Sequence, residues 1–248
     1  MTTIFDGQGS NPLNPFSTPI QALLTSSSLS SAPDETPAHL VITVITSSDP
    51  VHALWELWDA FFVTVASSVT SHGPLLALLD ALYAHPPTRP NNVPAGSDEE
   101  RQLCGYIQAE GKLHWAVLPR FSEQWRDFVV WQRRQVLSPL SVFSAALLKA
   151  TRGKGEVHPI WVFYACRDVL EREGLQPREP KAHRMPLEQM WALTATWVRD
   201  GSRVLWEANH EELRRHWAAA LDDKTELWPR EDGLTRERWR LWGRGCGF

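Results

Sequence analysis

The residues with the clearest potential for chemistry lie between positions 158 and 171. Tyr164 and Arg167 are three residues apart, so a helix would place both side chains on one face. A guanidinium there can hold an anionic or carbonyl group, and tryptophan rings can form apolar pocket walls. A histidine at the helix entrance can act as a general acid or base near neutral pH. The candidate catalytic residues are therefore Tyr164, Arg167 and His158, and the candidate ligand-binding residues are Trp161, Trp197 and Trp206.

The same side chains also have a structural interpretation. Arg167 can instead form a buried ion pair that locks helices together, with Asp127, Asp168 or Glu171 as its partner, and structural ion pairs are the commoner case. His158 directly precedes a proline, which suits a residue that caps a helix.

Metal and cofactor sites are not expected. Asp222, Asp223 and Glu226 have the outline of a DDxxE magnesium motif, but the run follows the end of a predicted helix and leads into a proline turn. A solvated run of charges explains it better. The three cysteines form no CxxC pair, and the chain has no HExxH, phosphate-binding loop or GxSxG element.

Composition limits the choice of partner and compartment. The net charge of −4 and the pI near 6.1 give no basic footprint for nucleic acid. The isolated cysteines favour a reducing compartment. No signal peptide or membrane-length apolar run is visible, so we expect a cytoplasmic protein that does not span a membrane. A hydrophobic small molecule is the ligand that the aromatic residues would suit, and the oligomeric state stays open.

The positions of apolar residues predict helices throughout. Asp49 and Pro50 form a cap and first turn, and an apolar stripe at helical spacing runs from Val51 to Val69. Residues 39–46 are β-branched, but no partner strand follows, which favours helix. Ser97 and Glu100 form a capping box for a helix that should reach Ala109.

Further helices are expected in the second half of the chain. The longest should run from Pro186 to about Ala208, and Thr235 should cap a final helix. In that helix we expect Trp239 and Trp242 to dock on the domain while the surrounding arginines stay in solvent or stack on rings. The prediction is an all-α protein with an irregular N-terminal arm, residues 1–37, and a single helical domain of nine to ten helices, residues 38–248.

Four segments resemble a known family. They are Leu54–Asp59 (LWELWD) with Leu75–Leu79, Trp161–Glu171 (WVFYACRDVLE), Ala195–Val198 with Leu205–Trp206, and Gly233–Trp242 (GLTRERWRLW). Over residues 38–242 the chain resembles the fungal domain of unknown function 3632, whose closing motif is the most specific part. The resemblance implies a helical fungal protein, in a family with some members near gene clusters of secondary metabolism. It supplies no catalytic residues. Where the family usually has aliphatic residues, this chain has Phe163–Cys166, so Tyr164 and Cys166 are candidates for its own chemistry.

Two functions are compatible with these observations. One is a cofactor-independent cyclase or isomerase of secondary metabolism that acts on a greasy substrate in an aromatic-lined pocket. The other is a non-catalytic helical scaffold or protein-interaction module, in which the aromatic residues form the core. An internal cavity lined by Tyr164 and Arg167 would favour the enzyme, and a solid core with an exposed apolar groove would favour the scaffold.

Overall fold

The computed structural model describes residues 14–25, 35–68, 72–94, 96–108, 110–132, 137–150, 163, 166–167, 169–171, 187–207, 224–230 and 234–245. These residues form ten α-helices and one 3-10 helix, and their only β-structure is a pair of isolated bridges, Thr88–Leu113 and Ile107–Leu113. The all-α prediction is therefore confirmed. The chain divides into two compact units, Met1–Phe128 and Val129–Phe248. This division does not test the boundary expected at residue 37 between the N-terminal arm and the helical domain, which stays a prediction.

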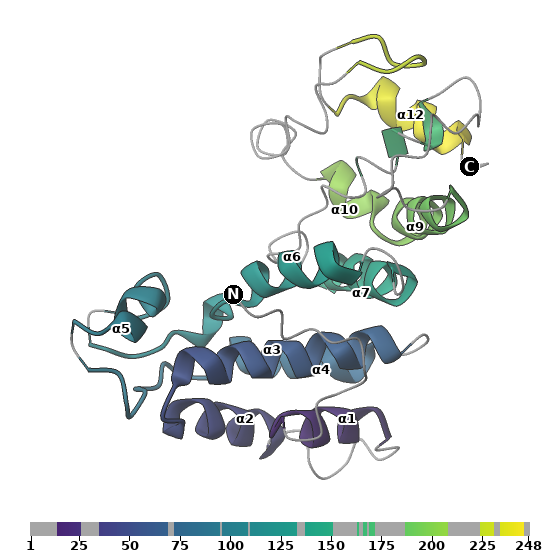
Figure 1. Ribbon diagram of the computed structural model, residues 1–248. Helices are drawn as coiled ribbons and strands as arrows, with labels where there is room; N and C mark the ends of the chain where they lie inside the picture. The colour runs from purple at the N-terminus through teal and green to yellow at the C-terminus, as the bar shows by residue number, and fades with distance from the viewer. Residues whose placement is uncertain are drawn as a thin grey trace. The chain divides into compact units, whose positions relative to one another are not determined.

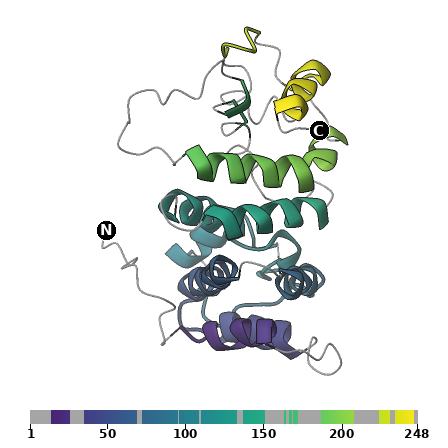
Figure 2. The same cartoon turned by 90° about the vertical axis from the view of Figure 1, so that its right-hand side faces the viewer.

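The first unit contains two layers of helices. Its elements are α1 (Ser17–Thr25), α2 (Glu35–Thr46), α3 (Pro50–Ser67), α4 (Gly73–Tyr83), α5 (Asp98–Leu103) and η1 (Trp115–Val117), followed by the start of α6 (Phe121–Gln132). Helices α1 and α2 each pack against both α3 and α4 (Figures 1 and 2).

The β-branched segment 39–46 is helical, as predicted. Leu40, Val41 and Val44 are buried, and they occupy adjacent positions on one face of α2, which packs on α3. The apolar face thus finds a helix to cover it, where a lone strand would have left its backbone groups without partners. Part of the N-terminal arm expected to be irregular is helical: α1 forms because Phe16 and Ile20 are fully buried against the unit.

The predicted caps occur in the structure, but one helix is shorter than expected. The Asp49 side chain accepts a hydrogen bond of 2.9 Å from the amide of His52, and Ser97 accepts one of 3.1 Å from the amide of Glu100. The Glu100 carboxylate binds the amide of Gly96, one residue before the expected one, at 2.6 Å. The helix ends at Leu103 instead of Ala109 because the chain turns there and Ile107 pairs with Leu113.

An aromatic cluster fills the core of the first unit. Its rings meet mostly edge to face at centroid distances of 5.0–6.1 Å, and they belong to Trp58, Phe61, Phe62, Phe121, Trp125 and Phe128. Such pairs add roughly 0.5–1.5 kcal/mol each beyond their buried area. The indole N–H of Trp58 donates to the carbonyl of Pro119 at 2.6 Å, so its one polar group is satisfied inside the core.

The second unit contains α7 (Leu137–Ala150), α9 (Leu187–Asp200), α10 (Ser202–Glu207) and α12 (Arg236–Gly245). Helices α7 and α9 pack along each other (Figure 2). The long helix expected from 186 to 208 is interrupted at Gly201, which separates α9 from α10. A Cβ atom at Gly201 would lie 2.8 Å from the ring of Trp197, so the missing side chain permits this close packing.

None of the helices in the described ranges combines the length and the apolar character needed to cross a membrane.

Candidate functional site

Three of the six predicted site residues lie outside the described part of the chain. They are Tyr164, His158 and Trp161, and Asp222 and Asp223 of the acidic run lie outside it as well. Arg167 is described; it is half-buried and follows Cys166, which is fully buried. Its neighbourhood therefore includes the apolar interior of the second unit.

The two described candidate pocket walls occupy different environments. Trp197 is buried in α9 and contacts Gly201. Trp206 in α10 is 39% exposed, and its ring lies 6.3 Å from that of Trp239 in α12, edge to face. The Arg236 guanidinium carbon lies 5.6 Å from the Trp206 ring centroid. Trp206 is thus part of an aromatic and basic surface.

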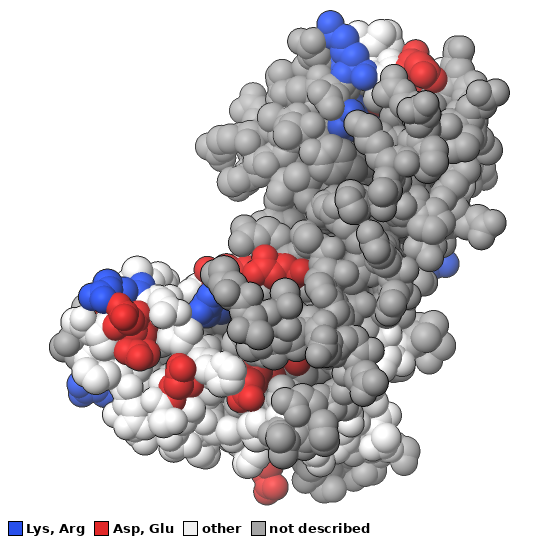
Figure 3. Space-filling model, in the orientation of Figure 1, with Lys and Arg blue, Asp and Glu red and all other residues white. Residues whose placement is uncertain are grey.

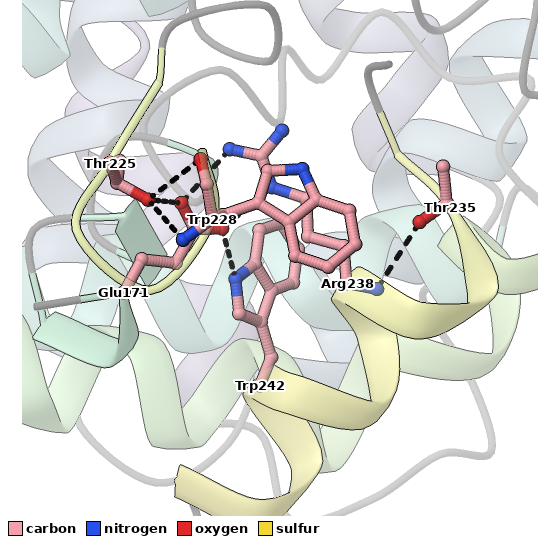
Figure 4. A network of polar contacts seen from close by, with 6 residues as sticks. All are labelled: Glu171, Thr225, Trp228, Thr235, Arg238 and Trp242. Atoms are coloured by element: carbon pink, nitrogen blue, oxygen red, sulfur yellow. Dashed lines mark hydrogen bonds and ion pairs between the residues drawn. The ribbon is translucent and has the colours of Figure 1, made fainter. Parts of the chain in front are cut away.

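Among the described residues, a buried polar network surrounds Glu171 (Figure 4). Arg238 donates from Nε to Oε1 of Glu171 at 2.6 Å and from Nη2 to Oε2 at 3.0 Å. The Trp242 indole donates to Oε1 at 2.7 Å, and the Thr225 hydroxyl donates to Oε2 at 2.7 Å. A carboxylate has about four lone-pair sites, so these four hydrogen bonds satisfy Glu171 fully.

The rings of Trp228 and Trp242 enclose the cation of the same network. The guanidinium carbon of Arg238 lies 5.8 Å from the first ring centroid and 5.6 Å from the second, which is within cation–π range. The side chains of Arg238 and Glu171 are both 0% exposed. Since every oxygen of the carboxylate already has donors, this cluster is suited to holding segments together and not to transferring protons.

Arg238 differs from the other arginines near Trp239 and Trp242, which we expect in solvent or stacked on rings. It stacks between Trp228 and Trp242 and is also completely buried, because Glu171 supplies the counter-charge that makes its burial possible. Both oxygens of the Glu171 carboxylate bind Arg238. The pairing of Arg167 with Asp127, Asp168 or Glu171 stays a prediction.

A signal for Arg238 was present in the sequence. It lies four residues before Trp242, so the two share one face of α12, and Thr235 caps the helix at the predicted place with a 3.2 Å bond from the Arg238 amide. The sequence distance between Glu171 and Arg238, 67 residues, gives no hint of their pairing.

The opposite face of α12 carries a row of arginines in solvent. Arg236, Arg240 and Arg244 are exposed and follow each other at intervals of four residues. Beside them a hollow of about 410 Å³, open to solvent, is lined by Glu237, Arg240, Gly243 and Arg244. A Cβ atom at Gly243 would meet nothing within 4 Å, so the space next to this residue in the hollow is empty.

Several basic residues in other parts of the described chain are paired with acidic side chains. Arg101, Lys112, Arg120 and Arg203 each form an ion pair with a nearby acidic side chain, and red and blue side chains touch in this way over α5 in Figure 3. Within the described residues, Arg240 and Arg244 have no such ion pair, although Glu237 lies in the same hollow. Their charge is available to a ligand.

The first unit holds a carboxyl group with an altered acidity. Burial, and to a lesser extent the nearby Glu56 carboxylate, raises the pKa of Asp59 in α3 from 3.8 to about 6. Glu56 also lies 3.6 Å from the imidazole of His52. Raised carboxyl pKa values occur both in catalytic sites and in buried structural positions. No group of three or more His, Cys, Asp or Glu side chains in the described ranges is arranged to hold a metal ion.

The comparisons with known proteins give a family and no named relative. The family described as "Protein of unknown function (DUF3632)" matches residues 58–245, which is most of the chain. No curated protein matches the chain. No solved structure matches it either. The matched range includes both the aromatic core residue Trp58 and the buried Glu171–Arg238 pair. This chain belongs to the DUF3632 family.

Proposed function

We propose that the chain is a non-catalytic interaction module that binds another protein through the outer face of α12. The observation that carries the proposal is the row of exposed arginines without ion-pair partners in the described chain, Arg236, Arg240 and Arg244, next to the half-exposed ring of Trp206. Arginine and tryptophan are the residue types most enriched at the energetic centres of protein interfaces.

The way α12 is anchored supports a binding role. Its inner face holds Arg238 and Trp242, which bind Glu171 through hydrogen bonds of 2.6–3.0 Å. A helix fixed in this way presents its outer face with little freedom, and a preorganised surface loses less conformational entropy on binding. The buried carboxylate of Glu171 supports the same proposal. It already accepts four hydrogen bonds, so it is suited to a structural role and not to catalysis.

The test is site-specific photo-crosslinking. A photoreactive amino acid replaces Arg240 in one protein and Ile42, an exposed apolar residue of α2, in the control. In extracts of the source cells we expect a discrete protein adduct from position 240 only. The adduct should disappear when Arg236→Glu and Arg244→Glu are added, with an unchanged melting temperature. Equal adducts from both positions, or an adduct insensitive to these charge reversals, would contradict the proposal.

The second candidate is an enzyme: a cofactor-independent cyclase or isomerase of fungal secondary metabolism, acting in the cytoplasm on a hydrophobic small molecule. The half-buried position of Arg167, directly after the fully buried Cys166, favours it, because a cation at the edge of an apolar interior can hold an anionic group of a greasy substrate. Tyr164 and His158 would supply the acid and base, and Trp161, Trp197 and Trp206 the walls.

The enzyme candidate has its own test. Arg167→Ala and Tyr164→Phe should each abolish turnover of an identified substrate while the circular dichroism spectrum and melting temperature stay the same. Retained turnover in both variants would exclude this assignment of roles.

A further inference from the structure

The spacing of the arginine row on α12 defines what can bind along it. Residues four apart on a helix are separated by about 6 Å along the axis, so Arg236, Arg240 and Arg244 span about 12 Å. Arg236 lies against the ring of Trp206, whereas Arg240 and Arg244 border the hollow. The surface therefore combines one ring-stacked cation with two cations that face an open space.

We infer that the partner of this surface is an acidic protein segment whose carboxylates are about 6 Å apart along one face, as at every fourth residue of a helix. This inference rests on the proposed function and adds the chemistry of its partner. One carboxylate would enter the hollow and accept hydrogen bonds from Arg240 and Arg244, because guanidinium groups bind carboxylates with well-defined, often bidentate geometry.

The distribution of charge along the chain agrees with an acidic partner. Residues 1–128 contain 13 acidic and 5 basic residues, whereas residues 129–248 contain 16 acidic and 20 basic ones. The net charge of the whole chain is thus slightly negative although the net charge of the second unit is positive. Long-range attraction between this unit and an acidic segment would raise the association rate, and salt would weaken it.

Glu237 favours a protein segment over a nucleic acid as the partner of this surface. Glu237 lies in the same hollow as Arg240 and Arg244. A phosphate backbone carries one negative charge per nucleotide and would repel this carboxylate, whereas an acidic peptide can leave a neutral residue opposite it. Nucleic acid is therefore an outcome that the experiment must be able to reveal.

The experiment measures binding of labelled peptides to the full chain by fluorescence anisotropy. One alanine-rich helical peptide carries glutamate at every fourth position, and a second has the same composition with its glutamates on different faces. A single-stranded oligouridylate is the third probe. We expect the first peptide to bind about tenfold more tightly than the second, since only matched charges can engage together.

Variants of the chain locate the site. Arg240→Glu combined with Arg244→Glu should weaken binding of the matched peptide by about tenfold or more. Gly243→Leu should weaken it too by filling the hollow, and it should not destabilise the fold because no atom lies within 4 Å of the new Cβ. Arg203→Glu is the matched control, because Arg203 is an exposed arginine of the same unit that lies outside α12.

Each other result overturns a defined part of the inference. Equal binding of the two peptides would show that the surface does not recognise the spacing of the carboxylates. Tighter binding of the oligouridylate would show that the partner is a nucleic acid and not an acidic protein segment. Self-association of the chain that the double arginine variant abolishes would replace the separate partner by a second copy. If no peptide binds while the crosslink at position 240 persists, the chemistry assigned to the partner is wrong and the interaction module remains.

Discussion

At the scale of single residues, Glu171 and Arg238 show how a charged pair can be placed in an apolar interior. Neither side chain is exposed, and a hydrogen-bonding hydroxyl and two indole rings complete their surroundings. Taking two charges out of water is unfavourable unless their geometry and remaining hydrogen bonds compensate for it. Removing one of the two partners should therefore lower the free energy of unfolding by more than the intact pair contributes to it.

A double-mutant cycle tests this coupling. Glu171→Gln should lower the free energy of unfolding by about 3–5 kcal/mol, because it leaves the Arg238 charge buried without a counter-charge. The double variant Glu171→Gln with Arg238→Met should lose much less stability than the sum of the losses in the two single variants. The measurement is urea unfolding followed by tryptophan fluorescence. Glu207→Gln, which breaks the exposed pair with Arg203, is the control and should change the free energy of unfolding little. Additive losses at positions 171 and 238 would show that the two side chains are not coupled.

Asp59 gives a prediction that depends on pH. Its folded-state pKa, about 6, is above its ordinary value of 3.8, so the folded protein binds a proton more tightly than the unfolded chain. Stability from this group is present below pH 4 and is lost as the pH rises through 6. Asp59→Asn should therefore raise stability at pH 7.5 by on the order of 1 kcal/mol, allowing for solvent that reaches the side chain, and change it little at pH 4.

Thermal unfolding of both proteins across this pH range measures the effect, with Asp80→Asn, an exposed carboxyl of α4, as the control. A constant difference between wild type and Asp59→Asn at all pH values would show that the carboxyl does not titrate between its two states as described.

At the scale of elements, Gly201, which separates α9 from α10, and Gly243, which lies within α12, have opposite roles. A Cβ atom at Gly201 would lie 2.8 Å from the Trp197 ring and 3.1 Å from its carbonyl oxygen, whereas one at Gly243 would meet nothing. Gly201→Ala should destabilise the protein by about 1–3 kcal/mol through overpacking. Gly243→Ala should stabilise it by about 0.5–1 kcal/mol through helix propensity. Differential scanning calorimetry of both variants tests the pair, and shifts of the same sign would contradict it.

The elements also show what local sequence can predict. Asp49, Ser97 and Thr235 were recognisable as caps because each acts on an amide within three residues of itself. The end of α5 at Leu103 depends on the pairing of Ile107 with Leu113, and the end of α9 depends on contact between Gly201 and Trp197. Helix starts were thus accessible from short patterns, while these two ends depend on tertiary neighbours.

The candidate surface was less accessible from the sequence than the helices. The closing motif predicted a final helix and docking tryptophans, but it did not separate the buried Arg238 from the exposed Arg240. That distinction requires the position of Glu171, which lies 67 residues earlier in the chain. Similarly, Trp206 has the same residue type as Trp197, and only the fold places one at the surface and the other inside.

At the scale of the whole molecule, the chain has two compact units, and α12 completes the second one. Deleting residues 234–248 removes Arg238 and Trp242 and leaves Glu171 with only the Thr225 hydroxyl among its side-chain donors described above. We expect a lower melting temperature and a loss of amide-exchange protection in α7 and α9, while α3 and α4 keep theirs. Exchange measured by mass spectrometry resolves the two units. An unchanged melting temperature would contradict the role of α12.

The pairing of Glu171 with a residue 67 positions later also has a consequence during translation. Ribosomes add roughly 5–20 residues per second, so about 3–13 s separate the synthesis of Glu171 from that of Arg238. During this interval Phe163, whose ring contacts that of Trp242, and Leu170, which lies beside Gly245, have no α12 to cover them. Nascent chains in this state are natural clients of chaperones, and the yield of the 129–248 unit in cells should depend on them more strongly than that of the 1–128 unit.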